Sequence, residues 1–207
     1  MQNNNQKTNI RGGLLTTILP NFVTYADSLI LSTAESLQLY QFTKQSKNVL
    51  LYRGSRDGFN APAFHSKCDN RNNTVTIIQT SGNYVFGGYT AMPWKSDYSY
   101  SYDPKAFIFS LRQASVYIIG AKFSVVDATT AIWNNPLTGP VFGSYIGYNF
   151  CDILVGYSGP YFNMADLGSS YSLPLGFSAH STTAQNYLAG SESGWIVTEI
   201  EVYQITK

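Results

Sequence analysis

Two residues with nucleophilic or acid–base side chains, His65 and Cys68, lie three positions apart in a segment that predicts a short helix. This spacing places both on one helical face, as a cysteine nucleophile and its histidine base require. The segment supplies no obvious third group to orient the base, and Cys68 is also in register with Ala61 and Phe64, as in a core stripe. We predict a buried structural thiol, with a thiol-dependent, peroxide-handling protein using Cys68 as an alternative.

Metal-binding residue types are few and poorly spaced. No paired Cys-x-x-Cys or His-x₃-His spacing occurs, so we predict neither a metal site nor a cofactor. His180 lies in a Ser/Thr-rich loop and is predicted to be solvated. The residues considered are His65, Cys68, Asp69, Cys151 and His180.

Glu199 and Glu201 project from one face of the last predicted strand. Alternate strand positions lie about 7 Å apart, a separation that glycoside hydrolysis permits. Most glycosidases draw their two carboxylates from different elements, and no Asp/Glu-rich cleft accompanies this pair. The sequence also lacks a phosphate-binding glycine loop, a G-x-S-x-G motif and a Rossmann fingerprint. We therefore expect a protein that is not an enzyme.

Arg56 and Asp57 together could serve an acidic or phosphate ligand, but Asp side chains commonly bond to the amides of a turn. We favour a structural role in the turn Asp57-Gly58. Gly87 and Gly88 lie inside a predicted strand, where they indicate a bulge or a close backbone approach. The 16 tyrosines and three tryptophans, Trp94, Trp133 and Trp195, leave a carbohydrate- or small-ligand-binding sandwich as a further alternative.

Charge and composition exclude several kinds of partner. The 13 basic and 12 acidic residues give a net charge of +1 without a Lys/Arg block, so we expect no nucleic-acid binding. No segment approaches about 20 apolar residues, so no membrane insertion is expected. With two cysteines and no visible signal peptide, a reducing, cytoplasmic setting is the simplest expectation.

Local signals predict two helices. Ser32 and Glu35 form a capping box that starts a helix running to about Gln45. Asn60 is a good N-cap for a second helix that ends near Cys68, and Pro62 in its first turn loses no hydrogen bond.

The remaining pattern predicts eight or nine short strands without βαβ alternation. In the last of them, Trp195 to Ile205, Trp195, Glu199 and Glu201 share one face and Ile200 and Val202 the other. Residues 158–190 are predicted to be irregular but ordered. The other expected strands are 49–52, 74–79, 84–90, 106–111, 116–119, 130–133 and 152–156.

These elements predict an α+β, mostly β fold, in which two packed antiparallel sheets form a β-sandwich flanked by a few short helices. Residues 1–12 are polar and are expected to form a disordered tail. Residues 13–207 are expected to form a single domain, since no linker divides them.

Seven segments, in order and in spacing, resemble a TLDc domain over roughly residues 25–207. The first runs from Leu50 to Asp69 and contains Tyr-Arg-Gly-Ser-Arg-Asp-Gly-Phe. The others are Thr74–Ile78, Phe86–Tyr89 with Trp94, Ala106–Leu111, Gly139–Gly143 with Asp152-Ile153, Leu188–Ser191, and Glu199–Tyr203.

The resemblance implies a β-sandwich flanked by helices and a non-enzymatic interaction module that protects against oxidative stress. Several members of the family bind the cytosolic sector of the vacuolar proton pump, so the resemblance implies a protein partner of this kind. Glu201 is similar to the family's characteristic acidic residue, Gly87 and Gly88 match its glycines, and Asp57 lies in its opening motif.

The chain departs from the oxidation-resistance branch of the family at two places. Pro104-Lys105 stands where that branch has Gly-Glu, and Gly143-Ser144-Tyr145-Ile146-Gly147 replaces part of a glycine-rich run. The sequence is closer to the TLDc modules of protists, fungi and invertebrates.

Overall fold

A computed structural model of the chain describes residues 25–114, 116–144, 151–156 and 163–206. The tail predicted over residues 1–12 lies outside these ranges, as does the start of the domain predicted at residue 13. Both boundaries therefore stay predictions. No helix within the described ranges is long and apolar enough to cross a membrane.

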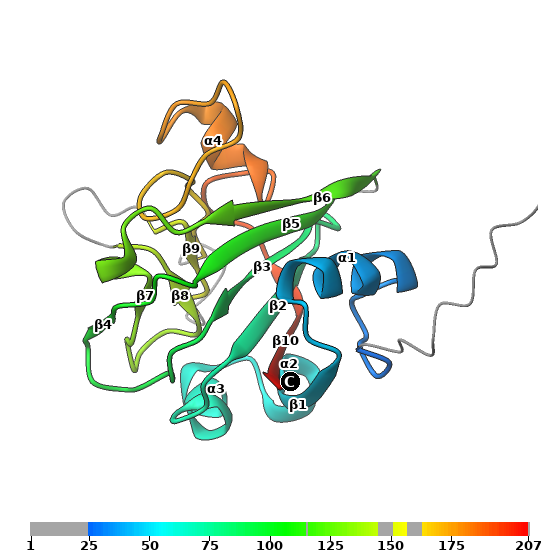
Figure 1. Cartoon of the computed structure of the whole chain (residues 1–207), viewed down its shortest axis with the longest axis vertical. Coiled ribbons are helices and arrows are strands. Elements are labelled where there is room, and N and C mark those ends of the chain that lie inside the picture. Colours follow the sequence, from blue (N-terminus) through cyan, green and yellow to red (C-terminus); the bar gives the residue numbers. More distant parts are fainter. Residues whose placement is uncertain (1–24, 115, 145–150, 157–162, 207) are drawn as a thin grey trace, which may run out of the picture.

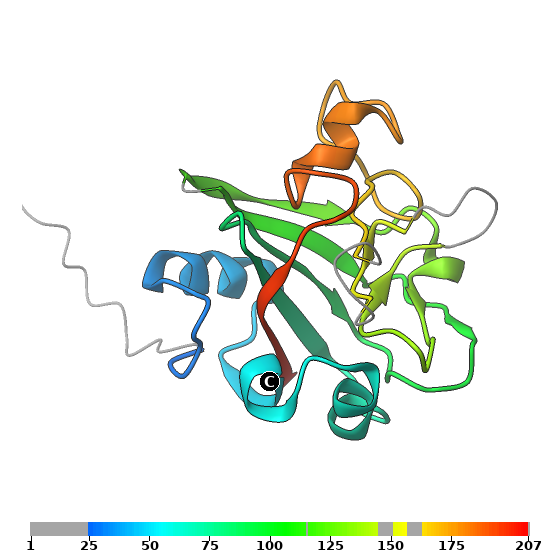
Figure 2. The same ribbon diagram turned by 180° about the vertical axis from the view of Figure 1, so that it is seen from behind.

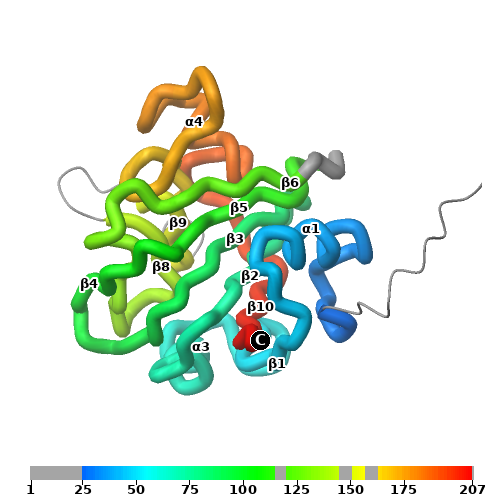
Figure 3. Tube along the Cα trace, viewed as in Figure 1, coloured from blue at the N-terminus to red at the C-terminus, as the bar shows by residue number. Residues whose placement is uncertain are grey.

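Ten strands in these ranges form two antiparallel sheets, which confirms the predicted α+β, mostly β fold class. They are β1 (Lys47–Arg53), β2 (Thr74–Thr80), β3 (Val85–Thr90), β4 (Tyr100–Ser101), β5 (Phe107–Gln113), β6 (Val116–Ser124), β7 (Ile132–Trp133), β8 (Val141–Phe142), β9 (Ile153–Leu154) and β10 (Val197–Thr206). The larger sheet has the order β1-β10-β2-β3-β5-β6, and the smaller has the order β4-β7-β8-β9. The C-terminal strand thus lies between two strands from the first half of the chain (Figure 3).

Four helices accompany the sheets in the same ranges: α1 (Thr33–Thr43), α2 (Gly54–Asp57), α3 (Ala61–Cys68) and α4 (Thr182–Tyr187), with a 3-10 turn η1 (Ala128–Thr130). The capping box of α1 is confirmed: Ser32 Oγ accepts the Glu35 N–H at 3.3 Å, and Glu35 Oε2 accepts the Ser32 N–H at 2.8 Å. The N-cap of α3 is also confirmed, since Asn60 Oδ1 accepts the Ala63 N–H at 2.9 Å. These helix starts are local hydrogen-bond patterns, which is why the sequence predicts them.

The prediction of only two helices was wrong. Asp57 of the predicted turn is the last residue of the one-turn helix α2, and Gly58 is its C-cap with φ +108°. The region predicted to be irregular over 158–190 contains α4, whose N-cap Ser181 accepts the Ala184 N–H at 3.3 Å. Helices this short carry too little periodicity to be predicted by pattern.

Both faces of the larger sheet are buried. On one face, Ile78, Phe86, Ile108, Ile200 and Val202 pack against side chains of the smaller sheet. The opposite face packs against α1 and the segment before it, and its core members are Tyr25, Ile30, Leu39, Val75, Ile77, Val85, Phe107, Phe109, Leu111, Tyr203 and Ile205. Figures 1 and 2 show this layering, with α1 on one side and the smaller sheet on the other.

The predicted face assignment of the last strand was wrong for Trp195. Trp195 is buried in the core between the sheets, together with Ile200 and Val202 rather than on the face of Glu201. The pairing of β10 with β2 shifts register between Val197 and Glu199. Such an irregularity breaks the alternation of side chains that the prediction assumed.

Candidate functional site

Glu201 lies in the interior, on β10 opposite Arg53 of β1. Arg53 Nη2 lies 2.8 Å from Glu201 Oε1, and Arg53 Nε donates to the same oxygen at 2.9 Å. The two side chains are 14% and 0% exposed, respectively. Burial lowers the pKa of Arg53, but its hydrogen bond to Glu201 and the attraction of that charge raise it overall. The pair is a buried, charge-assisted interaction.

The carboxylate of Glu201 also holds the segment before α1 against the sheet. Ser28 Oγ donates to Glu201 Oε2 at 2.6 Å, and the Leu29 N–H donates to Oε1 at 2.9 Å. Ser28 Oγ in turn accepts the N–H groups of Ile30 and Leu31 at 3.1 and 3.0 Å. One buried carboxylate therefore fixes the backbone of Ser28–Leu31, while the side chain of Leu29 is 65% exposed.

Tyr203 closes this network on the side of the core. Its hydroxyl donates to Asp27 Oδ1 at 3.2 Å and to Glu201 Oε2 at 3.3 Å. Burial and the nearby carboxylates of Glu201 and Asp27 raise the pKa of Tyr203. The phenol thus stays protonated and keeps donating. We call Asp27, Ser28, Leu29, Arg53, Glu201 and Tyr203 the Glu201 network.

A second buried ion pair joins α1 to the larger sheet. Arg112 Nη2 lies 2.7 Å from Glu35 Oε2, and Arg112 Nε donates to Glu35 Oε1 at 2.8 Å. Glu35 is also the capping-box residue, so one carboxylate both starts α1 and binds it to β5. The sequence predicts the first role but gives no signal for the second, because Glu35 and Arg112 are 77 residues apart.

Gly87 and Gly88 lie on β3, and the structure explains both by close approach. A Cβ on Gly87 would lie 1.9 Å from the backbone oxygen of Thr76, and one on Gly88 would lie 2.6 Å from Phe142 Cε1. Gly87 thus permits the approach of β2, and Gly88 the approach of the smaller sheet. Nothing in this geometry presents either glycine to a ligand.

Asp57 takes part in local contacts at the end of α2. Its Oδ2 accepts the Arg53 N–H at 3.0 Å and lies 2.7 Å from Arg56 Nη2. The hydrogen bond from Arg56 is the main reason why the pKa of Asp57 is lowered, and the Arg53 N–H lowers it further. These contacts agree with a structural role in the turn.

Glu199 is held in a similar way. Its Oε2 accepts the Ser55 hydroxyl at 2.5 Å, and its Oε1 accepts the N–H groups of Ser55 and Ile200 at 3.1 and 3.0 Å. Glu199 is 6% exposed. With Glu201 buried as well, the two carboxylates do not line an open cleft as glycoside hydrolysis requires.

Cys68 and Cys151 are free thiols with no exposed surface. Burial raises the pKa of both, and neighbouring carboxylates add to the effect. A thiol whose pKa is raised by burial ionises less readily and is a poor nucleophile. The peroxide-handling alternative therefore gains no support from the surroundings of Cys68.

Each histidine pairs with an aspartate. His65 Nδ1 lies 2.7 Å from Asp69 Oδ1, and its Nε2 lies 3.0 Å from the Asn135 carbonyl oxygen. Both ring nitrogens of His65 are thus engaged away from Cys68. His180 is exposed, as predicted, with 40% of its side chain accessible, and its Nδ1 also lies 2.9 Å from Oδ2 of the fully buried Asp166 side chain. No group of three or more metal-binding side chains occurs in the part of the chain that the structure describes.

The tryptophans are mostly core residues. Trp94 and Trp195 are 1% and 5% exposed, and Trp94 Nε1 donates to Thr74 Oγ1 at 3.0 Å. Trp133 stacks on Tyr100, with ring centroids 6.2 Å apart. Two of the three tryptophans are therefore unavailable to a carbohydrate.

The comparison with protein families agrees with this architecture. The TLDc domain model matches residues 25–206, which spans the described residues from the segment before α1 to the end of β10. The chain belongs to the TLDc domain family. No curated protein matches the chain.

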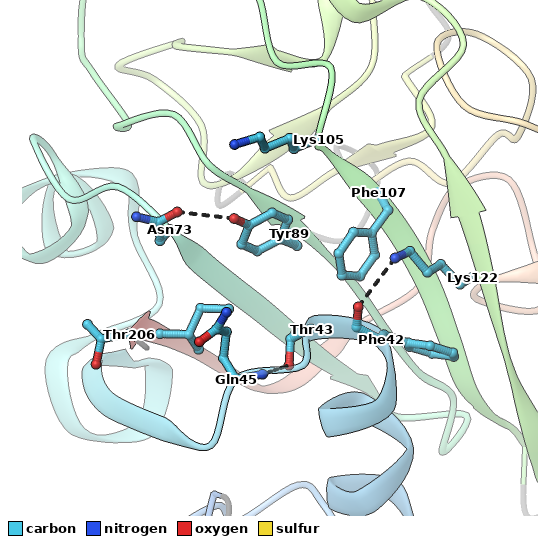
Figure 4. Close-up of a pocket in the computed structure, with 10 residues that line it drawn as sticks. Phe42, Thr43, Gln45, Asn73, Tyr89, Lys105, Phe107, Lys122 and Thr206 are labelled. Atoms are coloured by element: carbon cyan, nitrogen blue, oxygen red, sulfur yellow. Dashed lines mark hydrogen bonds between the residues drawn. The ribbon is translucent and has the colours of Figure 1, made fainter.

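The TLDc domain of this chain also contains a cavity of about 580 Å³ that no sequence pattern predicts. It lies between the connection from α1 to β1 and the strands β3, β5 and β6 (Figure 4). Its lining residues are far apart in the sequence, so no local motif indicates that they form a cavity. The lining residues are Phe42, Thr43, Gln45, Asn73, Tyr89, Lys105, Phe107, Lys122, Ile205 and Thr206.

Proposed function

We propose that this TLDc domain is a non-catalytic interaction module that binds a protein partner in the cytoplasm. We further propose that the partner is the cytosolic sector of the vacuolar proton pump and that binding serves protection against oxidative stress. Membership of the TLDc family supports the general assignment. The particular partner is an extension from the family resemblance.

The observation that carries the proposal is that Leu29 has a fixed backbone and an exposed side chain. Its N–H donates to the buried carboxylate of Glu201, whereas its side chain is 65% exposed. A large apolar side chain on a backbone fixed by a buried charge costs little further ordering when a partner covers it. Fixed, exposed apolar anchors are typical of protein-binding surfaces.

The proposal that the domain is non-catalytic rests on how its reactive groups are used. Cys68 is fully buried with a raised pKa, and the carboxylates of Glu199 and Glu201 are occupied by donors from β1, α2 and the segment before α1. These side chains stabilise the fold, and the fold holds the proposed binding surface around Leu29 in place.

The test is a pull-down of purified pump sectors with the wild-type chain and three variants. We expect Leu29→Ser to lose most of the binding and to remain folded, because only an exposed side chain changes. Leu175→Ser is the matched control, since Leu175 is fully exposed and lies in a different segment. Glu201→Ala should also lose binding, because the Ser28–Leu31 backbone is released.

Recovery of pump subunits by wild type and Leu175→Ser, but not by Leu29→Ser, would support the proposal. If no pump subunit is recovered at low or moderate salt, the pump is not the partner. If Leu29→Ser binds as well as wild type, the surface around Leu29 is not the binding surface. The link to oxidative stress is tested in peroxide-sensitive cells that lack their own TLDc protein. We expect the wild type to restore peroxide resistance and Leu29→Ser not to restore it.

A further inference from the structure

The cavity between α1 and strands β3, β5 and β6 has an aromatic wall. Tyr89 and Phe107 stack with their ring centroids 5.1 Å apart and an interplanar angle of 25°. Phe42 meets Phe107 edge-on, with centroids 6.5 Å apart. The Tyr89 hydroxyl is held by Asn73 Oδ1 at 3.1 Å. The rings are therefore fixed in place before any ligand arrives.

Two lysines lie on the same cavity. Lys122 Nζ lies 3.9 Å from the centroid of the Phe107 ring and donates to the Phe42 carbonyl oxygen at 3.3 Å. Lys105 is exposed, just before β5. Figure 4 shows both side chains around the rings of Tyr89 and Phe107.

The charge of this cavity is unbalanced. Its lining contains two lysines and no carboxylate, and none of the ion pairs among the described residues involves Lys44, Lys105 or Lys122. Partial burial and the neighbouring charge of Lys44 lower the pKa of Lys122. The nearby carboxylate of Asp103, whose charge helps raise the pKa of Tyr89, is buried, and its oxygens accept hydrogen bonds from Thr90 and from the backbone. An anion entering the cavity would meet two ammonium groups that form no ion pair among the described residues.

We propose that this cavity binds a small organic anion of mononucleotide size, with a planar ring against the aromatic wall and its phosphate facing Lys122 and Lys105. The cavity volume falls within the range of about 300–1,000 Å³ that is usual for small-ligand sites. Planar rings pack well on fixed aromatic side chains, and an ammonium group is a common phosphate partner. The site is separate from the Glu201 network and from the binding surface around Leu29, so it stands whether or not the pump is the partner.

The test is a titration of the full chain with adenosine monophosphate, followed by NMR chemical-shift changes. Adenosine and inorganic phosphate, tested alone, separate the contribution of the ring from that of the anion. We expect the monophosphate to bind more tightly than either and to shift resonances of Tyr89, Phe107 and Lys122. Binding should weaken with added salt, since part of it is electrostatic.

Lys105→Gln and Lys122→Gln should each weaken binding by about tenfold, the loss expected for one charge-assisted contact. Lys95→Gln is the matched control, because Lys95 is an exposed lysine outside the cavity. Lys105 is exposed and its replacement leaves the fold intact, so that variant alone decides the question if Lys122→Gln is unstable. Any of three results would overturn the proposal. Lys105→Gln and Lys95→Gln could bind adenosine monophosphate equally well, or the chemical-shift changes could be confined to residues outside the cavity. The third such result is that adenosine binds as tightly as its monophosphate.

Discussion

Arg53 and Glu201 face each other across β1 and β10, and their side chains meet at 2.8 Å in the interior of the domain. Because Glu201 also accepts hydrogen bonds from Ser28 and Leu29, this pair connects the segment before α1 to the C-terminal strand. We therefore expect Glu201→Ala to lower the free energy of unfolding by about 3 kcal/mol or more, the usual cost of leaving a buried charge unpaired. Chemical denaturation measures this cost.

The control for Glu201 is Glu192→Ala. The Glu192 side chain makes no hydrogen bond within the described ranges, and its removal should change stability little. A loss of stability in Glu192→Ala equal to that in Glu201→Ala would show that the Glu201 network is not what stabilises the domain.

The two functions of Glu35 can be separated by mutation. Ser32→Ala removes the cap of α1 and the hydrogen bond from Ser32 Oγ to Glu35 Oε2, leaves the Glu35–Arg112 pair in place, and should cost about 1 kcal/mol. Glu35→Ala also leaves Arg112 without its partner and should cost about 3 kcal/mol. Thermal unfolding of both variants gives the comparison, and equal costs would mean that the Glu35–Arg112 pair contributes nothing beyond the cap.

Gly87 should not tolerate a side chain. A Cβ there would lie 1.9 Å from the Thr76 carbonyl oxygen, which is backbone and cannot rotate away. We expect Gly87→Ala to cost about 3 kcal/mol or more through overpacking. Gly82→Ala is the matched control, since its nearest neighbour would be Tyr84 Cδ2 at 3.3 Å. Similar expression and melting temperature for both variants would contradict the close approach of β2 and β3.

Asp152 should make stability depend on pH. Burial raises its pKa to about 7, although three backbone N–H groups, of Gly168, Ser169 and Ser170, act in the opposite direction. The folded state therefore keeps a proton that the unfolded state, with a pKa of about 3.9, has already released. The stabilisation from this proton is complete below about pH 4 and is lost as the pH rises to about 7, with a total of at most about 4 kcal/mol.

Urea denaturation at several pH values, for wild type and Asp152→Asn, measures this contribution. The variant cannot ionise, so the difference between the two proteins should shrink or change sign toward low pH. A difference that is constant from pH 4 to 8 would show that Asp152 is ionised throughout.

The two thiols should be inert in the native state. Cys68 and Cys151 are completely buried, and burial raises the pKa of both. A thiol reagent at neutral pH should label neither cysteine in native buffer and both in denaturant. Rapid labelling of native Cys68, lost in Cys68→Ser, would instead revive the peroxide-handling alternative.

Local chemistry determined much of this protein. The capping box at Ser32 and Glu35, the N-cap at Asn60 and the strand periodicity of β2, β3 and β5 depend on neighbours in the chain, so the sequence predicts them. For Gly87 and Gly88 the sequence predicted either a bulge or a close backbone approach, and the structure shows the close approach. The ordered motifs were enough to indicate the TLDc family.

Only the tertiary structure decided which residues the charged and aromatic side chains contact. The register shift before Glu199 moved Trp195 into the core between the sheets, and a strand pattern alone cannot place such a shift. Pairs such as Arg53–Glu201, Glu35–Arg112 and His180–Asp166 join segments that only sheet pairing or loop packing brings together. The cavity beside Lys122 arises in the same way. Contacts between distant residues depend on the complete three-dimensional packing, whereas caps and periodicity depend only on the chain nearby.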